Sequence, residues 1–230
     1  GLRERVIEYA EFIAGKVRQI GGAQVFLYGL VDCPERGEEA GEYFNAHNVD
    51  LIFAHAGTYV NSASILPVHQ VCKAPVVILN LQPTAKINYA RTTTGEWLAH
   101  CGACPVPEMT NAFNRSGIDC HIINGLLGLD YTPEISMTDE NTASRPEAVR
   151  AWKQIEEWVL AASVKSGLSN ARFGFLGNTF NGMLDMYSDF TMFQGQTGAH
   201  LEVLEMCDLN RMLETVTEEE VEAKKEEITE

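Results

Sequence analysis

Short apolar runs alternate with segments of helical periodicity along the first two thirds of the sequence. Four runs bounded by glycine, proline or polar residues fit buried strands, at residues 23–28, 50–56, 75–80 and 118–123. Around them, apolar residues recur at helical spacing, which predicts helices at residues 2–13, 35–47, 62–71, 94–100, 105–115 and 145–164. Alternating strands and helices are typical of βαβ units, so we predict the α/β class with a doubly wound, Rossmann-like parallel sheet.

A second strand–helix pattern follows the polar residues 166–170, which we interpret as a linker. It begins with an apolar run at residues 171–176, and a glycine-containing turn then leads to Met183, Met186 and Tyr187 at helical spacing. We therefore predict an N-terminal α/β domain at residues 1–166 and the beginning of a second α/β domain at residues 171–230.

The end of the chain continues this second pattern. A further strand is predicted at residues 200–204. Thr217 and Glu220 form a capping box that predicts the start of an acidic helix. The glycines and methionines of the second pattern also fit a tight turn and an ordinary core, without any role in binding.

Charge and apolar content exclude two classes of partner. The formal net charge is −15, from 17 basic and 32 acidic residues, so anionic nucleic acids and membrane surfaces are repelled. The sequence has no apolar run of membrane-spanning length and no signal peptide, and its six cysteines are scattered. We expect a cytoplasmic protein with reduced thiols.

Cys101 and Cys104 have the CxxC spacing of many metal sites. A second cysteine pair or a histidine pair that would complete a zinc site is missing from the sequence. We therefore expect buried structural thiols here, and no metal.

Polar side chains gather in the loops that follow two predicted strands. Residues 55–61 and 80–84 supply neutral amides, hydroxyls and an imidazole at the sheet edge where such folds bind ligands. Neutral groups of this kind suit the hydroxyls of a polyol. Glu96, Trp97 and His100 share one helical face and could meet the same ligand. The alternative is an exposed glutamate, a core tryptophan and a helix-terminal histidine.

The motifs at residues 55–59, 79–83, 94–100 and 172–189 resemble, in the same order, those of the L-arabinose isomerase and L-fucose isomerase superfamily, closest to its arabinose isomerase-like branch. This resemblance implies an N-terminal, a central and a C-terminal domain, assembled as trimers or hexamers. It implies aldose–ketose isomerisation through an enediol at a divalent metal, usually Mn²⁺. The chain would be the N-terminal domain without its first strand, plus the opening of the central domain.

The resemblance also implies roles for particular residues. Tyr59 and His100 match residues that a neighbouring subunit lends to the sugar pocket, and Met183 matches a methionine that lines the substrate. Trp97 stands where arabinose isomerases tend to carry glutamine, so the resemblance does not identify which sugar is the substrate. The candidate substrate-binding residues are Tyr59, Glu96, Trp97, His100 and Met183; the catalytic residues and the Mn²⁺ ligands are expected outside this chain.

Two other functions are compatible with an α/β fold. A non-catalytic sugar-binding or regulatory module is the main alternative. A nucleotide-dependent oxidoreductase is disfavoured, because the GxxG at Gly174 and Gly177 lacks the first tight-turn glycine and an acidic ribose partner.

Overall fold

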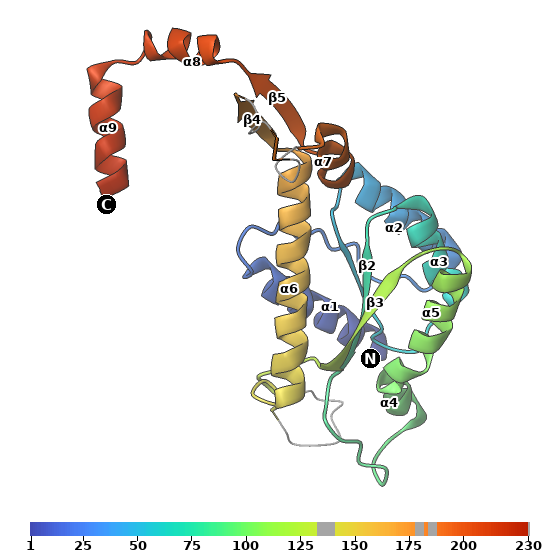
Figure 1. Cartoon of the computed structure of the whole chain (residues 1–230). Helices are drawn as coiled ribbons and strands as arrows, with labels where there is room; N and C mark the ends of the chain where they lie inside the picture. Colours follow the sequence, from blue (N-terminus) through green and yellow to red (C-terminus); the bar gives the residue numbers. More distant parts are fainter. Residues whose placement is uncertain (133–140, 178–181, 184–187, 230) are drawn as a thin grey trace. The chain divides into compact units, whose positions relative to one another are not determined.

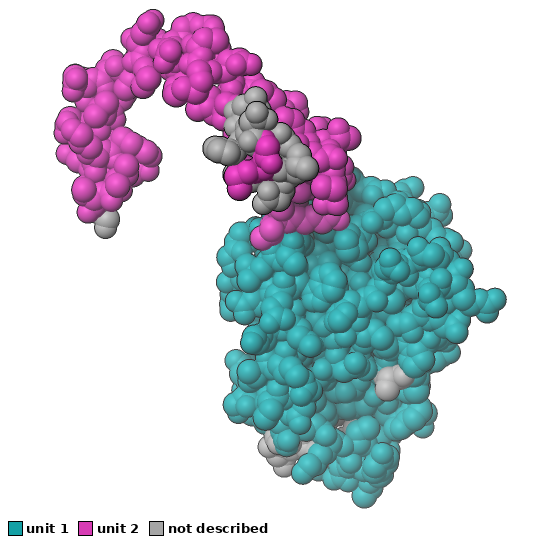
Figure 2. Space-filling view, in the orientation of Figure 1, with its two compact units in different colours: residues 1–163 teal, residues 164–230 magenta. Residues whose placement is uncertain are grey.

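The computed structural model describes residues 1–230 except 133–140, 178–181, 184–187 and 230 (Figure 1). The chain divides into two compact units, Gly1–Ser163 and Val164–Glu230 (Figure 2). Each unit combines parallel strands with helices, so the protein is of the mixed α/β kind.

The first unit contains most of the elements that the apolar pattern predicts. Three of the four predicted strands and all of the predicted helices are present, with ends that differ from the prediction by a few residues. In chain order the elements are α1 Leu2–Arg18, α2 Pro34–Ala46, β1 Ile52–His55, α3 Ser62–Val71, β2 Val76–Gln82, α4 Thr94–Ala99, the 3₁₀ helix η1 Cys101–Ala103, α5 Pro105–Arg115, β3 Cys120–Leu126 and α6 Pro146–Ser169, which continues into the second unit.

The sheet of the first unit is parallel, with the strand order β1-β2-β3. Successive side chains of a strand point to opposite faces, and both faces of β2 are apolar. Val77, Leu79 and Leu81 belong to one core cluster with α1 and α6, whereas Val76 and Ile78 belong to another with α5. Helices therefore cover both faces of the sheet, as Figure 1 also shows.

The predicted strand at residues 23–28 is wrong. This segment has no ladder partner in the part of the chain that the structure describes. Its aromatic side chains pack on α2: the ring of Phe26 lies 4.3 Å from that of His47, and the ring of Tyr28 lies 5.7 Å from that of Tyr43. Ala23 and Val25 pack against the core cluster of α1 and α6. Packing on a helix and on this core thus accounts for the apolar run without strand pairing.

The second unit contains a two-stranded parallel sheet and three short helices in its described residues. The elements are β4 Arg172–Leu176, α7 Phe190–Thr197, β5 His200–Leu204, α8 Met206–Leu213 and α9 Glu218–Thr229. The strands at both predicted positions are confirmed, and so is the capping box, in which the backbone N–H of Thr217 donates to Glu220 at 2.9 Å. Among the described residues of this unit, Ala199 is the one that is fully buried.

Two predictions for this region need correction or stay open. The predicted linker at residues 166–170 is mostly helical, because α6 runs to Ser169. Its polar side chains bond back to the helix, and the Ser169 hydroxyl donates to the carbonyl of Lys165 at 2.9 Å. In the predicted methionine-rich helix, Met183 lies outside any helix, whereas Met186 and Tyr187 lie outside the described residues.

Candidate functional site

The carboxyl ends of the three parallel strands define the candidate site. β1 ends at His55, β2 at Gln82 and β3 at Leu126, and parallel strands bring these ends to one edge of the sheet. The loop after β1 is tied to α4, because the hydroxyl of Thr58 donates to the carbonyl of Leu98 at 3.2 Å. The edge therefore brings together residues from three separate stretches of the sequence.

Three side-chain amides form a row across β2 and β3. Asn80 and Asn124 are register partners, and the Asn80 amide donates to the Asn124 side-chain oxygen at 2.7 Å. The Gln82 amide in turn donates to the Asn80 side-chain oxygen at 3.2 Å. A row of this kind keeps both donor and acceptor groups, and it carries no charge.

The 3₁₀ helix η1 packs directly onto this amide row. A Cβ atom on Gly102 would lie 2.8 Å from the Asn80 side-chain oxygen, 2.8 Å from the Gln82 side-chain nitrogen and 2.9 Å from the carbonyl of Ala56. Contacts of that length are too short for a side chain. Only glycine therefore lets the backbone of η1 approach the sheet edge so closely.

We predict that Gly102→Ala destabilises the first unit by about 1–3 kcal/mol, because the added methyl group overpacks this contact. Gly95→Ala is the matched control: Gly95 lies in α4, and nothing would lie within 4 Å of its Cβ. The control should change stability by less than about 1 kcal/mol, in the stabilising direction. Urea unfolding followed by tryptophan fluorescence measures both; equal effects of the two substitutions would contradict the close approach.

His100 lies immediately after α4 and uses both ring nitrogens in hydrogen bonds. Nδ1 lies 2.9 Å from the carbonyl of Glu96, and Nε2 lies 2.8 Å from the hydroxyl of Thr84. A carbonyl can only accept, so Nδ1 carries a proton and donates it. The Thr84 hydroxyl, which lies beside Nε2, is also within hydrogen-bond distance of the carbonyl of Lys86, at 3.1 Å. The histidine thus connects α4 to the loop after β2.

Glu96 and Trp97 have different surroundings on α4. The Glu96 carboxylate closes a capping box, where it accepts from the backbone N–H of Thr93 at 2.8 Å and from the Thr93 hydroxyl at 2.9 Å. The backbone hydrogen bond from Thr93, followed by that from its hydroxyl, lowers the pKa of Glu96. Trp97 has an exposed fraction of 45%, so the indole is a surface group and not a core residue.

Tyr59 is also a surface group, with an exposed fraction of 51%. Its hydroxyl donates to a carboxylate oxygen of Glu108 at 3.4 Å, and the other oxygen accepts from the backbone N–H of Ser62 at 2.8 Å. The negative charge of Glu108 raises the pKa of Tyr59, and the hydrogen bond from Ser62 lowers that of Glu108. Glu108 is absent from the sequence-based candidates. Its position in the first turn of a predicted helix, where acidic residues are favoured, is a signal that could have identified it.

His55 is held inside the edge. Its Nε2 donates to the carbonyl of Leu81 at 3.4 Å, and burial lowers its pKa to about 4. The ring is therefore neutral at pH 7, and one of its nitrogens is hydrogen-bonded to the main chain of the neighbouring strand.

Four of the five predicted substrate-binding residues, namely Tyr59, Glu96, Trp97 and His100, belong to the elements around this edge. Met183 belongs to the second unit and has an exposed fraction of 44%. Whether any of the five binds a substrate stays a prediction.

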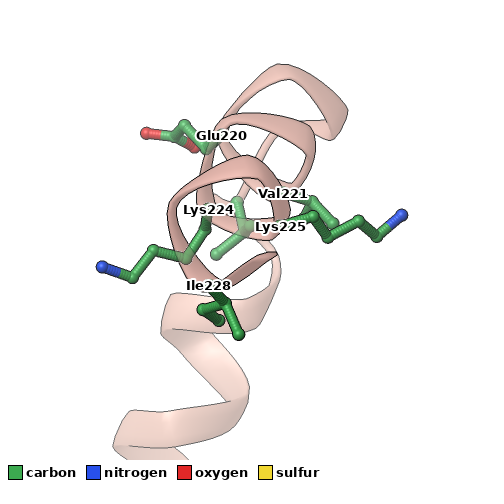
Figure 3. Close-up of a pocket in the computed structure, with 6 residues that line it drawn as sticks. Glu220, Val221, Lys224, Lys225 and Ile228 are labelled. Carbon is green, nitrogen blue, oxygen red and sulfur yellow. The ribbon is translucent and has the colours of Figure 1, made fainter. Parts of the chain in front are cut away.

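Other features of the described residues supply no second site of this kind. A hollow on the surface is lined by Val216, Glu220, Val221, Lys224, Lys225 and Ile228 (Figure 3). These residues come from α9 and the turn before it, so the hollow lies along a single helix and is not enclosed by facing elements. In the described ranges, no group of three or more His, Cys, Asp or Glu side chains could hold a metal ion.

Among the helices that the structure describes, none has both the length and the apolar character that crossing a membrane requires. No protein-family model matches the sequence, and neither does any curated protein.

Proposed function

We propose that this chain is part of a metal-dependent sugar isomerase that interconverts an aldose and a ketose of the L-arabinose or L-fucose type. The observation that carries the proposal is the pair of exposed aromatic residues, Tyr59 and Trp97, in the segments around the carboxyl edge of the sheet, where a row of amides supplies neutral hydrogen-bonding groups. Exposed aromatic faces pack against the apolar faces of sugar rings, while neutral amides and imidazoles bond to the hydroxyls. The motif resemblance supports the same reading.

In this proposal the first unit supplies a wall of the pocket. Trp97 and Tyr59 cover the sugar and exclude water, and His100, fixed by Thr84 and the carbonyl of Glu96, presents a ring of constant orientation. The Glu96 carboxylate keeps α4 in place through its capping box. A wall this open would be completed by another copy of the protein, which fits a trimer or hexamer.

The metal does not fit the residues at hand. The described side chains include no cluster of three or more candidate ligands, and the neutral amides at the sheet edge are not the anionic set that Mn²⁺ prefers. We propose that the ion and the groups that move the proton are supplied by other residues of the parent protein. No catalytic step is assigned to the residues of this chain.

The test is the isomerisation of L-arabinose, L-fucose and D-galactose by the longer parent protein, with and without Mn²⁺. We expect turnover that depends on the metal, and none from the 230-residue chain alone. Trp97→Ala and Tyr59→Ala in the parent should each raise KM about tenfold, because each removes roughly 1.4 kcal/mol of stacking. Val149→Ala, at an exposed position of α6, is the control that should leave KM unchanged.

Two outcomes would contradict the proposal. A parent that isomerises sugars equally well after chelation would exclude the metal-dependent reaction. Sugar binding by the isolated chain that survives a chelator, with no turnover in the parent, would instead favour the non-catalytic sugar-binding module.

A further inference from the structure

Cys101 and Cys104 lie at either end of one 3₁₀ turn. Cys101 is the first residue of η1, and the backbone N–H of Cys104 donates to the carbonyl of Cys101 at 3.0 Å. In a 3₁₀ helix, side chains three positions apart eclipse, and a rise of about 2 Å per residue separates their Cα atoms by about 6 Å. Disulfides span Cα separations of about 4.4–6.8 Å. The Cα separation expected for this turn therefore lies within the range of a disulfide.

The two cysteines differ in their access to solvent. Cys101 is buried, with an exposed fraction of 6%, whereas Cys104 is exposed, contrary to the expectation of two buried thiols. The neighbouring Cys104 side chain, with burial adding to its effect, raises the pKa of Cys101. One thiol is thus reachable from solvent and the other is sheltered.

We propose that Cys101 and Cys104 form a redox-active dithiol, which exchanges with a small-molecule disulfide and closes into an internal Cys101–Cys104 disulfide. The exposed position of one sulfur, the shelter of the other and the 3₁₀ geometry that joins them carry this assignment. It is independent of the proposed sugar isomerase.

The exchange proceeds in two displacements. The Cys104 thiolate attacks one sulfur of the disulfide RSSR, a mixed Cys104–SR disulfide forms, and the first RS⁻ leaves and takes up a proton. Cys101 then loses its proton, and its thiolate attacks the Cys104 sulfur, so that the Cys101–Cys104 bond forms and the second RS⁻ leaves. The dithiol is oxidised by two electrons, and RSSR is reduced to two RSH.

The position of the dithiol links its redox state to the sheet edge. Gly102, between the two cysteines, is the residue that packs on the amides of Asn80 and Gln82. Closing the disulfide would fix the turn that covers the edge.

The test equilibrates the whole 230-residue chain with mixtures of oxidised and reduced glutathione and maps the products by mass spectrometry. We expect a Cys101–Cys104 peptide that has lost two hydrogen atoms and carries no glutathione. Cys207 is the internal control, because it is also exposed and lies in the first turn of a helix, α8, but has no cysteine three positions away. It should retain glutathione as a mixed disulfide.

Two variants separate the steps. Cys101→Ser should accumulate glutathione on Cys104, because no second thiol displaces it. Cys104→Ser should reduce the oxidation of Cys101 by about tenfold or more, because buried thiols react slowly. Circular dichroism confirms that each variant is folded. Stable glutathione on Cys104 of the unmodified chain, without an internal disulfide, would overturn the proposal, and so would equal oxidation of Cys101 in Cys104→Ser.

Discussion

Lowering the pH from 7 to 5 is expected to destabilise the first unit by roughly 3–4 kcal/mol, because two of its histidines are held neutral. His69 and His55 each have a folded-state pKa of about 4, against 6.5 for the free side chain. The measurement is urea unfolding at a series of pH values, followed by tryptophan fluorescence. All three tryptophans, Trp97, Trp152 and Trp158, lie in the first unit, so the fluorescence reports on that unit.

The buried position of His69 explains its part of the effect. The residue has an exposed fraction of 2%, its ring lies 4.9 Å from that of Phe113 in an edge arrangement, and its Nδ1 has no hydrogen-bond partner among the described residues. Burial lowers its pKa first, and the positive charge of Lys73 adds to the shift. Protonating this ring in the folded state would place an unpaired charge beside an aromatic core.

The sign follows from proton binding. Between pH 6.5 and 4, the unfolded chain binds protons at these histidines and the folded chain does not, so acidification favours unfolding. The free energy of unfolding is therefore highest above pH 6.5 and falls as the pH drops towards 4. Below pH 4, these two histidines lower it no further. His69 contributes about 2 kcal/mol between pH 7 and 5. His55 contributes less, because it keeps some contact with solvent.

His69→Met removes the titrating group while keeping an adaptable apolar side chain in its place. The variant should lose about 2 kcal/mol of the pH dependence between pH 7 and 5, whatever its stability at pH 7. His121→Gln, which removes an exposed imidazole of β3, is the control variant. If His69→Met unfolded with the full pH dependence of the unmodified chain, His69 would not be the group responsible.

Local patterns predicted most helices and strands of the first unit, because the residues within each segment set its apolar periodicity. Helices α3 and α5 have the predicted ends, Ser62–Val71 and Pro105–Arg115. The segment 23–28 failed for the opposite reason. A buried strand and an extended segment packed on a helix have the same apolar composition, and pairing depends on partners far along the chain. The extension of α6 through residues 166–169 shows that small polar residues do not end a helix by themselves.

The candidate site divides in the same way. The capping box of Thr93 and Glu96 has a sequence signature, Thr-x-x-Glu, that could have been recognised. The contact between Thr84 and His100 joins residues 16 positions apart, and the Asn80–Asn124 pair spans 44. Such contacts depend on strand register and loop path, which periodicity does not specify. The exposure of Trp97, which excludes a core position, is likewise a tertiary property.

Gly37→Ala is expected to destabilise the first unit by about 3 kcal/mol, the second large effect that we predict. Helices α2 and α3 pack through the glycines of α2. A Cβ on Gly37 would lie 2.3 Å from the backbone carbonyl oxygen of Ser64, and one on Gly41 would lie 2.7 Å from the Cβ of Val71. A backbone atom cannot turn away as a long side chain can, so the two helices would have to separate and expose apolar surface.

Gly15→Ala tests whether packing or helix propensity decides this outcome. Gly15 lies within α1, and a Cβ added there would have nothing within 4 Å, so alanine should stabilise that helix by roughly 0.5–1 kcal/mol. The same substitution in two helices of one unit should therefore have opposite signs in urea unfolding followed by tryptophan fluorescence. A gain for both variants would mean that α2 and α3 can separate at little cost. Opposite signs would mean that α2 and α3 can pack this closely only when residue 37 has no side chain. Helix propensity alone does not explain such a requirement.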